Sequence, residues 1–461
     1  MRLLLLLASA AAISKVPKAP TAGRAAAISS KTPQKPTTGR AAAKAQAEQA
    51  KPLALSGGAK QKQVSYAWAV LHNWLYFLSL GLCIPVLPKV IASTVNDDGA
   101  AVITSKSARV AGDVEGVDKL LTFLFVGALG ACSDGVGRKP LIALSALGYA
   151  TTVLVQARAT KVAHFFAADA IDGLTSCMNA VCAAFVADAT SNDSGAARAA
   201  ALGVFQGLSV GGAFIVGFPM AAILSKGGKY RKPMYLAASL QLLNAFLALF
   251  VTPESAPKSK GIKWDEANPI SSLGQLDLFK ASTPLKKTAI AFSLVWLGNL
   301  ALNACFVPYV DAKFGWGPQQ SGPLLVVVGL MLAVVPKLVV PRLGVVGAAN
   351  FGCLVYALGF ICAALAPTGP QYVAAIVVCG FGAVAVPALT SIVAGAADRN
   401  SKGAVLGGLQ TLQELASAAG YPLYGRLLAR GLDGDTGIPV GAPYFAAAAF
   451  LVLGALQARR L

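Results

Sequence analysis

Long apolar runs dominate this chain, and they constrain its fold more than any other feature. From residue 64 onward, stretches of about 20 apolar residues alternate with short polar segments. A run of that length can cross a bilayer as a helix, and this chain has many such runs rather than one. Only 13% of its residues are charged, against about 25% in soluble globular proteins. We therefore predict an all-α membrane protein with many spans and little chain left for a separate catalytic domain.

Twelve transmembrane helices are predicted, six on each side of a polar linker. The predicted spans are 66–91, 117–133, 140–155, 162–187, 199–224, 234–251, 288–310, 321–340, 346–366, 372–394, 404–428 and 442–456. The corresponding domains are a leader (1–63), an N-terminal six-helix bundle (64–251), a hydrophilic linker (252–284) and a C-terminal six-helix bundle (285–461). Two six-helix bundles joined in this way are typical of transporters built from internal repeats.

The leader, residues 1–63, has its own composition. Arg2 precedes a leucine run and a small-residue stretch, as in a signal peptide. A basic, acid-poor tract with a duplicated Pro-Thr-x-Gly-Arg-Ala-Ala-Ala segment follows, and we expect it to be disordered. This arrangement resembles the two-part plastid leaders of algae with complex plastids, which implies the plastid envelope. A basic cytoplasmic tail on an endomembrane or plasma-membrane protein is the alternative.

The net charge of +19 does not indicate nucleic-acid binding. Eleven of the 39 lysines and arginines lie in the leader with a single acid, so about half of the net charge is there. The rest is spread over short loops, where basic residues commonly border lipid. The eight cysteines are dispersed without a C-x-x-C pair, and there are only two histidines. Neither a metal site nor a disulfide framework is predicted.

A glycine-punctuated, charged loop between the second and third spans is the most specific motif. It contains Gly130, Asp134, Gly137, Arg138 and Lys139. The pattern G-x-x-x-D-x-x-G-R-K resembles the signature loop of the major facilitator superfamily, although the residue after the aspartate is usually basic and is glycine here. The resemblance implies a conformational gate, in which Asp134 and Arg138 hold the bundles together in the outward-facing state. A tight turn anchored at the headgroups is the alternative.

Three further stretches extend the resemblance to about residues 64–461. Residues 81–88, 185–190 and 252–255 are similar to helix ends of the drug and tetracycline antiporters. The resemblance implies the major facilitator fold and transport by alternating access. The antiporters usually carry an arginine in the fourth helix, and the best match here is Asp169. Coupling through that arginine is therefore not expected in this chain.

Ionisable groups within the spans are candidates for coupling, because charges in lipid are costly and usually face water or a partner. Glu414 lies near the middle of the eleventh span, and Asp169 and Asp172 share one face of the fourth. They are interpreted as carboxylates that bind protons or a cationic solute. Structural hydrogen bonding within a bundle is the alternative.

Neutral polar residues within the spans form a second group of candidates for contact with a solute or ion. They are His72, Asn73, Gln206, Asn299, Asn303 and Gln410. The alternative for each is a hydrogen bond between helices, and for His72 a neutral, fully bonded imidazole.

We therefore predict a secondary active transporter of a small organic solute, working by alternating access as a proton-coupled antiporter. An uncoupled facilitative carrier and a transporter-like receptor or scaffold are the alternatives. No phosphate-binding loop and no nucleophile–base pair is found in the sequence, so neither an enzyme nor a cofactor is expected. The expected partners are the solute, protons and the lipid bilayer, and we expect a monomer.

Overall fold

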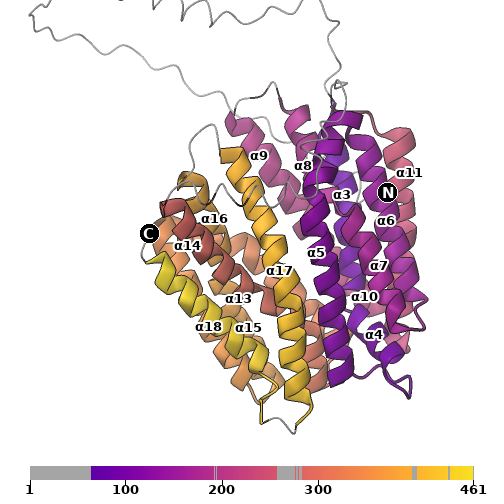
Figure 1. The fold of residues 1–461 in the computed structure, drawn as a ribbon, viewed down its shortest axis with the longest axis vertical. Helices are drawn as coiled ribbons and strands as arrows, with labels where there is room; N and C mark the ends of the chain where they lie inside the picture. The colour runs from indigo at the N-terminus through magenta and orange to yellow at the C-terminus, as the bar shows by residue number, and fades with distance from the viewer. Residues whose placement is uncertain are drawn as a thin grey trace, which may run out of the picture. The chain divides into compact units, whose positions relative to one another are not determined.

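Helices make up all of the regular secondary structure in the described part of the computed structural model (Figure 1). The described residues are 64–191, 193, 195–256, 276, 279, 283–396, 402–434 and 437–459. The predicted leader, 1–63, and most of the predicted linker, 252–284, lie outside them. The helices belong to one unit, Gln63–Leu461.

The N-terminal half contains the elements that precede the linker. They are α3 (Ala67–Cys83), α4 (Leu87–Val95), α5 (Ser105–Val136), α6 (Arg138–Ala157), α7 (Val162–Thr175), α8 (Met178–Ala189), α9 (Gly195–Gln206), η1 (Gly207–Gly211), α10 (Gly212–Leu224), η2 (Lys226–Gly228), α11 (Arg231–Phe246) and η3 (Leu247–Val251). The C-terminal half contains α13 (Thr283–Phe314), α14 (Pro318–Leu365), α15 (Gly369–Gly382), α16 (Ala385–Ala396), α17 (Lys402–Leu432) and α18 (Ala442–Ala458).

Several of these elements combine into single spans. By length and composition alone, eight described helices can cross a membrane, or nine if α3 and α4, bent by 44° at their junction, form one span. The 48-residue α14 is long enough for two spans, and it is interrupted at Gly344, whose φ of 68° is left-handed. With α14 divided there, and with α17 and the shorter apolar α18 added, the described residues account for the twelve predicted spans.

Each half has its own hydrophobic core. The buried apolar residues of one cluster lie between positions 69 and 248. Those of the other lie between 279 and 458, joined by three residues at the α4–α5 end of the N-terminal half: Ala92, Ile103 and Ala108. Two cores of this kind confirm the predicted fold of two six-helix bundles, because each half buries most of its apolar surface against itself.

A seam of glycines brings the two halves together along α5 and α17. A Cβ on Gly112 would lie 2.6 Å from the carbonyl oxygen of Tyr421 and 3.0 Å from the Cα of Gly425. A Cβ on Gly116 would lie 2.5 Å from the ring of Pro422. Small residues let membrane helices approach backbone to backbone, so this crossing depends on the missing side chains.

The predicted start of the second span, residue 117, is wrong. Helix α5 begins at Ser105, where Thr104 caps it by accepting a hydrogen bond from the Ser107 amide. Acidic residues at 113, 115 and 118 lower the hydropathy of this stretch, so that a prediction based on hydropathy favours a loop. In the structure they belong to the helix, because their side chains have neighbouring helices to face instead of lipid.

Polar contacts join the halves at the end of the molecule opposite the signature loop. Lys89 of α4 forms a buried ion pair with Asp311 of α13, which also accepts a hydrogen bond from the Ile103 amide. Arg426 of α17 lies 2.7 Å from the carboxylate of Asp113 on α5. In Figure 1, α5 and α17 run side by side at this end. The two bundles are therefore closed against each other there.

The buried pair provides a test of this closure. Lys89→Met leaves the Asp311 carboxylate buried without its counter-ion, and we expect the free energy of unfolding to fall by about 3 kcal/mol. Unfolding of the detergent-solubilised protein measures the change. Adding Asp311→Asn should restore most of the stability, since the amide oxygen still accepts from Ile103. A single variant as stable as the unmodified protein would contradict this role.

Candidate functional site

Three charged side chains of α5 lie at the centre of the site. Glu115, Asp118 and Lys119 occupy one face of the helix, because positions three and four residues apart are neighbours. The ammonium of Lys119 lies 2.5 Å from an oxygen of Asp118 and 3.4 Å from an oxygen of Glu115. One ammonium therefore neutralises part of two carboxylates on its own helix.

Helix α7 adds two more carboxylates. Gly173 packs directly on α5, since a Cβ there would lie 2.6 Å from the carbonyl oxygen of Asp118. This contact places Asp172 in the electrostatic field of Asp118 and Lys119. Asp169, one turn earlier and buried, accepts a hydrogen bond of 2.5 Å from the amide of Gln156 on α6.

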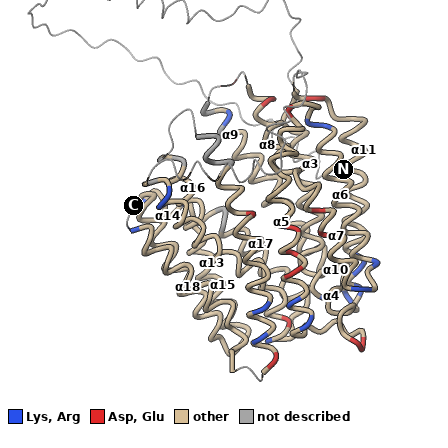
Figure 2. The backbone as a smooth tube through the Cα atoms, viewed as in Figure 1, with Lys and Arg blue, Asp and Glu red and all other residues tan. Residues whose placement is uncertain are grey.

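Helix α17 contributes the fifth carboxylate, from the other half of the molecule. Glu414 interacts electrostatically with Lys119, Asp118 and Glu115. Its helix is held against α5 by the glycine seam described above. We call Glu115, Asp118, Lys119, Asp169, Asp172 and Glu414 the carboxylate cluster. In Figure 2, acidic positions lie at mid-height on α5, α7 and α17.

The carboxylate cluster combines five acids with one lysine, and two of its side chains are partly exposed. The side chains of Glu115 and Lys119 are 30% and 25% exposed. A charged group within a membrane that retains exposure faces a polar path rather than lipid. Chemically, the arrangement can hold a cation: a proton shared among carboxylates, or the charged end of a solute.

The structure thus brings together three of the predicted residues, Asp169, Asp172 and Glu414. Glu115, Asp118 and Lys119 were not among the candidates from the sequence. Glu115 precedes the predicted second span, 117–133, and Asp118 and Lys119 stand at its very start rather than in its middle. Gly112 and Gly116 carried a usable signal: two small residues four apart favour a packed helix through this charged stretch over a loop.

His72 lies apart from the carboxylate cluster, buried between α3 and α11. Its Nδ1 donates to the Asn244 side-chain oxygen at 2.6 Å, and its Nε2 lies 2.7 Å from the Thr252 hydroxyl. The Asn244 amide in turn donates to the His72 carbonyl oxygen. Both ring nitrogens have partners, as in the alternative interpretation of a bonded imidazole that joins helices.

Asn73 and Gln206 meet around a residue that the sequence did not single out. Both donate to the side-chain oxygen of Asn179 on α8, at 3.0 and 3.3 Å. Asn73 also donates to the Ser209 hydroxyl in η1. The group connects α3, α8, α9 and η1.

The remaining neutral candidates are in the C-terminal half. Asn299 and Asn303 of α13 line a cavity of about 370 Å³ between α13, α14, α15 and α16. Gln410 is exposed on α17 and has no hydrogen bond to any residue that the structure describes.

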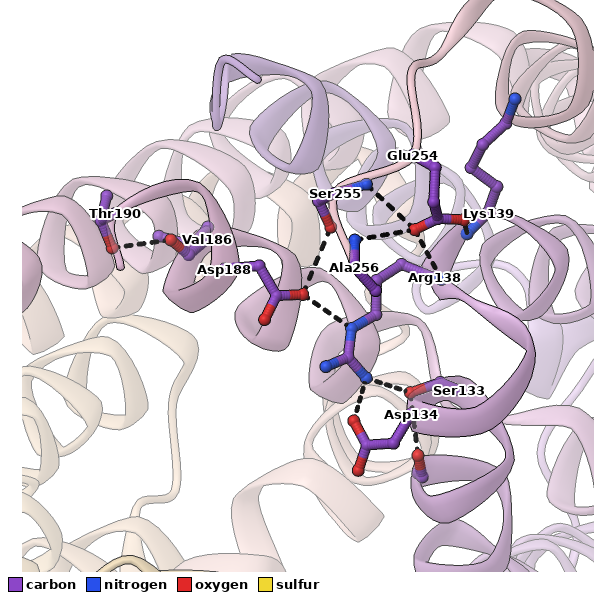
Figure 3. Close-up of polar contacts among 11 residues, drawn as sticks. Ser133, Asp134, Arg138, Lys139, Val186, Asp188, Thr190, Glu254, Ser255 and Ala256 are labelled. Atoms are coloured by element: carbon purple, nitrogen blue, oxygen red, sulfur yellow. Dashed lines mark hydrogen bonds and ion pairs between the residues drawn. The ribbon is translucent and has the colours of Figure 1, made fainter. Parts of the chain in front are cut away.

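The signature loop is held by residues of its own half (Figure 3). Arg138 pairs with Asp134 four residues earlier and donates to Asp188, at the end of α8, at 2.9 Å. Glu254, after η3, accepts from the backbone amides of Arg138 at 2.9 Å and Lys139 at 3.2 Å. A carboxylate at the N-terminus of a helix stabilises that helix. Glu254 therefore connects the start of α6 to the segment that follows η3, at the end of the N-terminal half.

Gly137 makes this connection possible. Its φ of 104° is left-handed, and a Cβ there would lie 2.5 Å from an oxygen of Glu254. Any larger residue would be strained and would also push the carboxylate away. A Cβ on Gly130 would have no described neighbour within 4 Å, so this glycine does not serve a close approach in this state.

The sequence of most of this chain matches the model of a known family. The Major Facilitator Superfamily model matches residues 70–421. The chain belongs to the Major Facilitator Superfamily. It is therefore a multi-pass membrane transporter and not an enzyme. Family members bind small solutes, as predicted.

Relatives support the branch that the helix-end motifs indicated. The transporter is 26% identical over 348 residues to the class C tetracycline resistance protein of Escherichia coli, and the alignment covers 74% of this chain and 84% of that protein. It is 27% identical over 329 residues to human major facilitator superfamily domain-containing protein 10, covering 65% and 69% of the two chains.

Solved structures show the same fold. The human organic anion transporter MFSD10 (TETRAN) superposes with a TM-score of 0.60 at 23% identity, covering 87% of this chain and all of that one. The nucleoside transporter NupG gives a TM-score of 0.66 at 14% identity, covering 86% and 98%. At these identities the likeness concerns the fold alone.

The loop geometry generates a kinetic prediction. Asp134 is exposed, and among the described residues its carboxylate pairs with Arg138. We expect Asp134→Asn to lower the turnover of transport several-fold while leaving the apparent KM within about twofold, because the change affects the loop and not the carboxylate cluster. Initial rates in proteoliposomes separate the two constants. Asp98→Asn, at another exposed acid, is the control; a variant that changes only KM would contradict the gate.

Proposed function

We propose that this transporter exchanges a small organic cation for protons at the carboxylate cluster. The observation that carries the proposal is the meeting of five carboxylates and one lysine from α5, α7 and α17. A cationic group and a proton both require the ionised form of such a site, so their binding is mutually exclusive. Mutually exclusive binding couples the two fluxes in opposite directions when the empty site does not change sides.

The position of Glu414 supports coupling between charge and conformation. It is the one member of the carboxylate cluster contributed by the C-terminal half. Protonating it, or pairing it with a solute cation, changes its attraction to Lys119 across the seam. An interaction that differs between two conformations shifts their populations by its differential free energy. Occupancy of the carboxylate cluster would thereby bias the rocking of the two bundles.

The proposal includes the predicted organisation of the chain. The transport unit is a single chain in the bilayer, with bundles at 64–251 and 285–461 connected by the linker 252–284. No cofactor takes part. The signature loop acts as the gate, and it engages the other half when the contacts at the opposite end separate.

Neutralising Glu414 tests the proposal. In proteoliposomes with an imposed pH gradient, we expect Glu414→Gln to abolish gradient-driven accumulation of an organic cation. Ethidium is the probe, and the fluorescence of entrapped DNA reports its uptake. The variant keeps the shape of the side chain and removes its charge, so a loss of accumulation reports on the charge alone.

Asp433→Asn, at an exposed acid just after α17, is the matched control and should accumulate ethidium normally. Accumulation by Glu414→Gln at the unmodified rate would remove this residue from coupling. Equal uptake by the unmodified protein with and without the gradient would identify an uncoupled carrier. No uptake by any form, together with retained binding of a protein partner, would favour the receptor alternative.

We further propose that residues 1–63 direct the transporter to the plastid envelope by a signal peptide followed by a transit tract. These residues lie outside the described part of the structure, and their composition is the support. Fused to a fluorescent protein in an alga with a complex plastid, they should direct fluorescence to the plastid. A fusion lacking residues 1–12 should remain in the cytosol. Fluorescence of the full leader in the endomembranes would contradict the plastid location.

A further inference from the structure

We propose that the cavity in the C-terminal half is a subsite that binds an aromatic ring of the solute through stacking and two amides. This inference rests on the proposed function, which concerns the cationic group of the solute. It adds the chemistry that would recognise the rest of the solute. The cavity is built by α13, α14, α15 and α16, and it does not include the carboxylate cluster.

The cavity has the size and lining of a small ligand site. Its volume of about 370 Å³ is at the lower end of the range for ligand pockets, about 300–1,000 Å³. Trp296 and Tyr356 supply aromatic surface, and Val328 and Cys379 supply apolar surface. A volume of this size accommodates one aromatic ring, including a single ring of a larger solute.

Two amides on one face of α13 provide unused hydrogen-bonding capacity. Asn299 and Asn303 are four residues apart and both line the cavity. The Asn299 side-chain oxygen accepts from the Tyr356 hydroxyl at 3.0 Å, and its NH₂ group has no partner among the described residues. Asn303 is exposed and has no hydrogen bond to a described residue. The free donors would recognise an acceptor on the ring, such as an ether or carbonyl oxygen.

Lipid is a poor occupant for this cavity. Both amides lie well within the 32-residue α13, at membrane depth. An acyl chain would leave the NH₂ group of Asn299 and the amide of Asn303 unsatisfied, and each unsatisfied group in an apolar environment costs about 1–3 kcal/mol. A ligand with its own polar atoms, or water, satisfies them.

Trp296 connects the cavity to the carboxylate cluster. Its indole N–H donates to the Ser417 hydroxyl on α17 at 3.0 Å. Ser417 is three residues after Glu414, so the two occupy neighbouring positions of the same helix face. A solute with its ring against Trp296 therefore lies beside the helix that carries Glu414. The arrangement selects an aromatic amine with an acceptor on the ring.

Three amines test these features one at a time. The first, 2-(4-methoxyphenyl)ethylamine, has the ring, the acceptor and the ammonium. Phenethylamine lacks the acceptor, and 2-cyclohexylethylamine lacks the aromatic ring. Binding to the purified full-length protein in nanodiscs, without any gradient, is measured by calorimetry and by quenching of tryptophan fluorescence. We expect the methoxy amine to bind most tightly and cyclohexylethylamine most weakly.

Variants of the subsite should change this ranking. Asn303→Ala should weaken the methoxy amine about fivefold, the value of one hydrogen bond, and leave phenethylamine within about twofold. Asn303→Ser, which retains a donor, should recover part of the loss. Trp296→Phe should remove most of the quenching, because no other tryptophan lines the described cavity. Asn350→Ala removes an amide of α14 outside the cavity and is the matched control.

The outcomes separate this inference from the proposed function. Equal binding of all three amines, or variants at Asn303 and Trp296 that bind like the unmodified protein, would overturn the subsite even if Glu414→Gln abolishes exchange. The expected ranking and losses would establish the subsite even if exchange proves independent of Glu414. No measurable binding of any amine at millimolar concentration would also overturn it. Unfolding curves for each variant confirm that it is folded.

Discussion

The close packing of α5 between α7 and α17 is the constraint on which the rest of the arrangement depends. Gly173 on one side and Gly112 and Gly116 on the other let three backbones approach without intervening side chains. Charged residues can occupy the middle of α5 because this packing gives them polar partners on their own and neighbouring helices instead of lipid. The packing of α17 on α5 also brings Glu414, a residue of the C-terminal half, into the carboxylate cluster.

The charged residues of the carboxylate cluster determine which ligands it favours. With five acids and one lysine, the carboxylate cluster favours a bound cation over a bound anion. In the proposed exchange, a cation bound at the carboxylate cluster is attracted to groups of both halves. A change of charge there would thereby be linked to a relative movement of the bundles.

The two ends of the molecule are stabilised differently in this state. Away from the signature loop, the halves are joined by the buried Lys89–Asp311 pair and by the glycine seam. At the signature loop, Arg138 and Glu254 bind partners within the N-terminal half. The structure thus corresponds to a state closed at the first end, in which the loop is ordered by its own bundle.

The sequence by itself determined the class of protein, the number of spans and the family. Apolar runs predict helices in lipid because the hydrophobicity of a segment is the sum of the contributions of its own residues. The signature loop is a contiguous motif, and its turn and the helix start that follows depend on residues adjacent in the sequence. The pairing of Arg138 with Asp134 is likewise local, since the two residues are four apart in the sequence. Hydropathy failed at α5, where helix-interior charges have the composition of a loop.

Only the tertiary structure decided which of these residues act together. Asp172 and Glu414 are separated by more than half of the chain. His72 and Asn299 are both polar residues within apolar spans. Their different surroundings follow from which helix faces are opposed, and that depends on packing between segments distant in sequence. Local sequence patterns do not specify which helix faces are opposed. A polar residue on a helix can bridge to another helix, line a water-filled path or bind a ligand, and its neighbours in the tertiary structure decide among these.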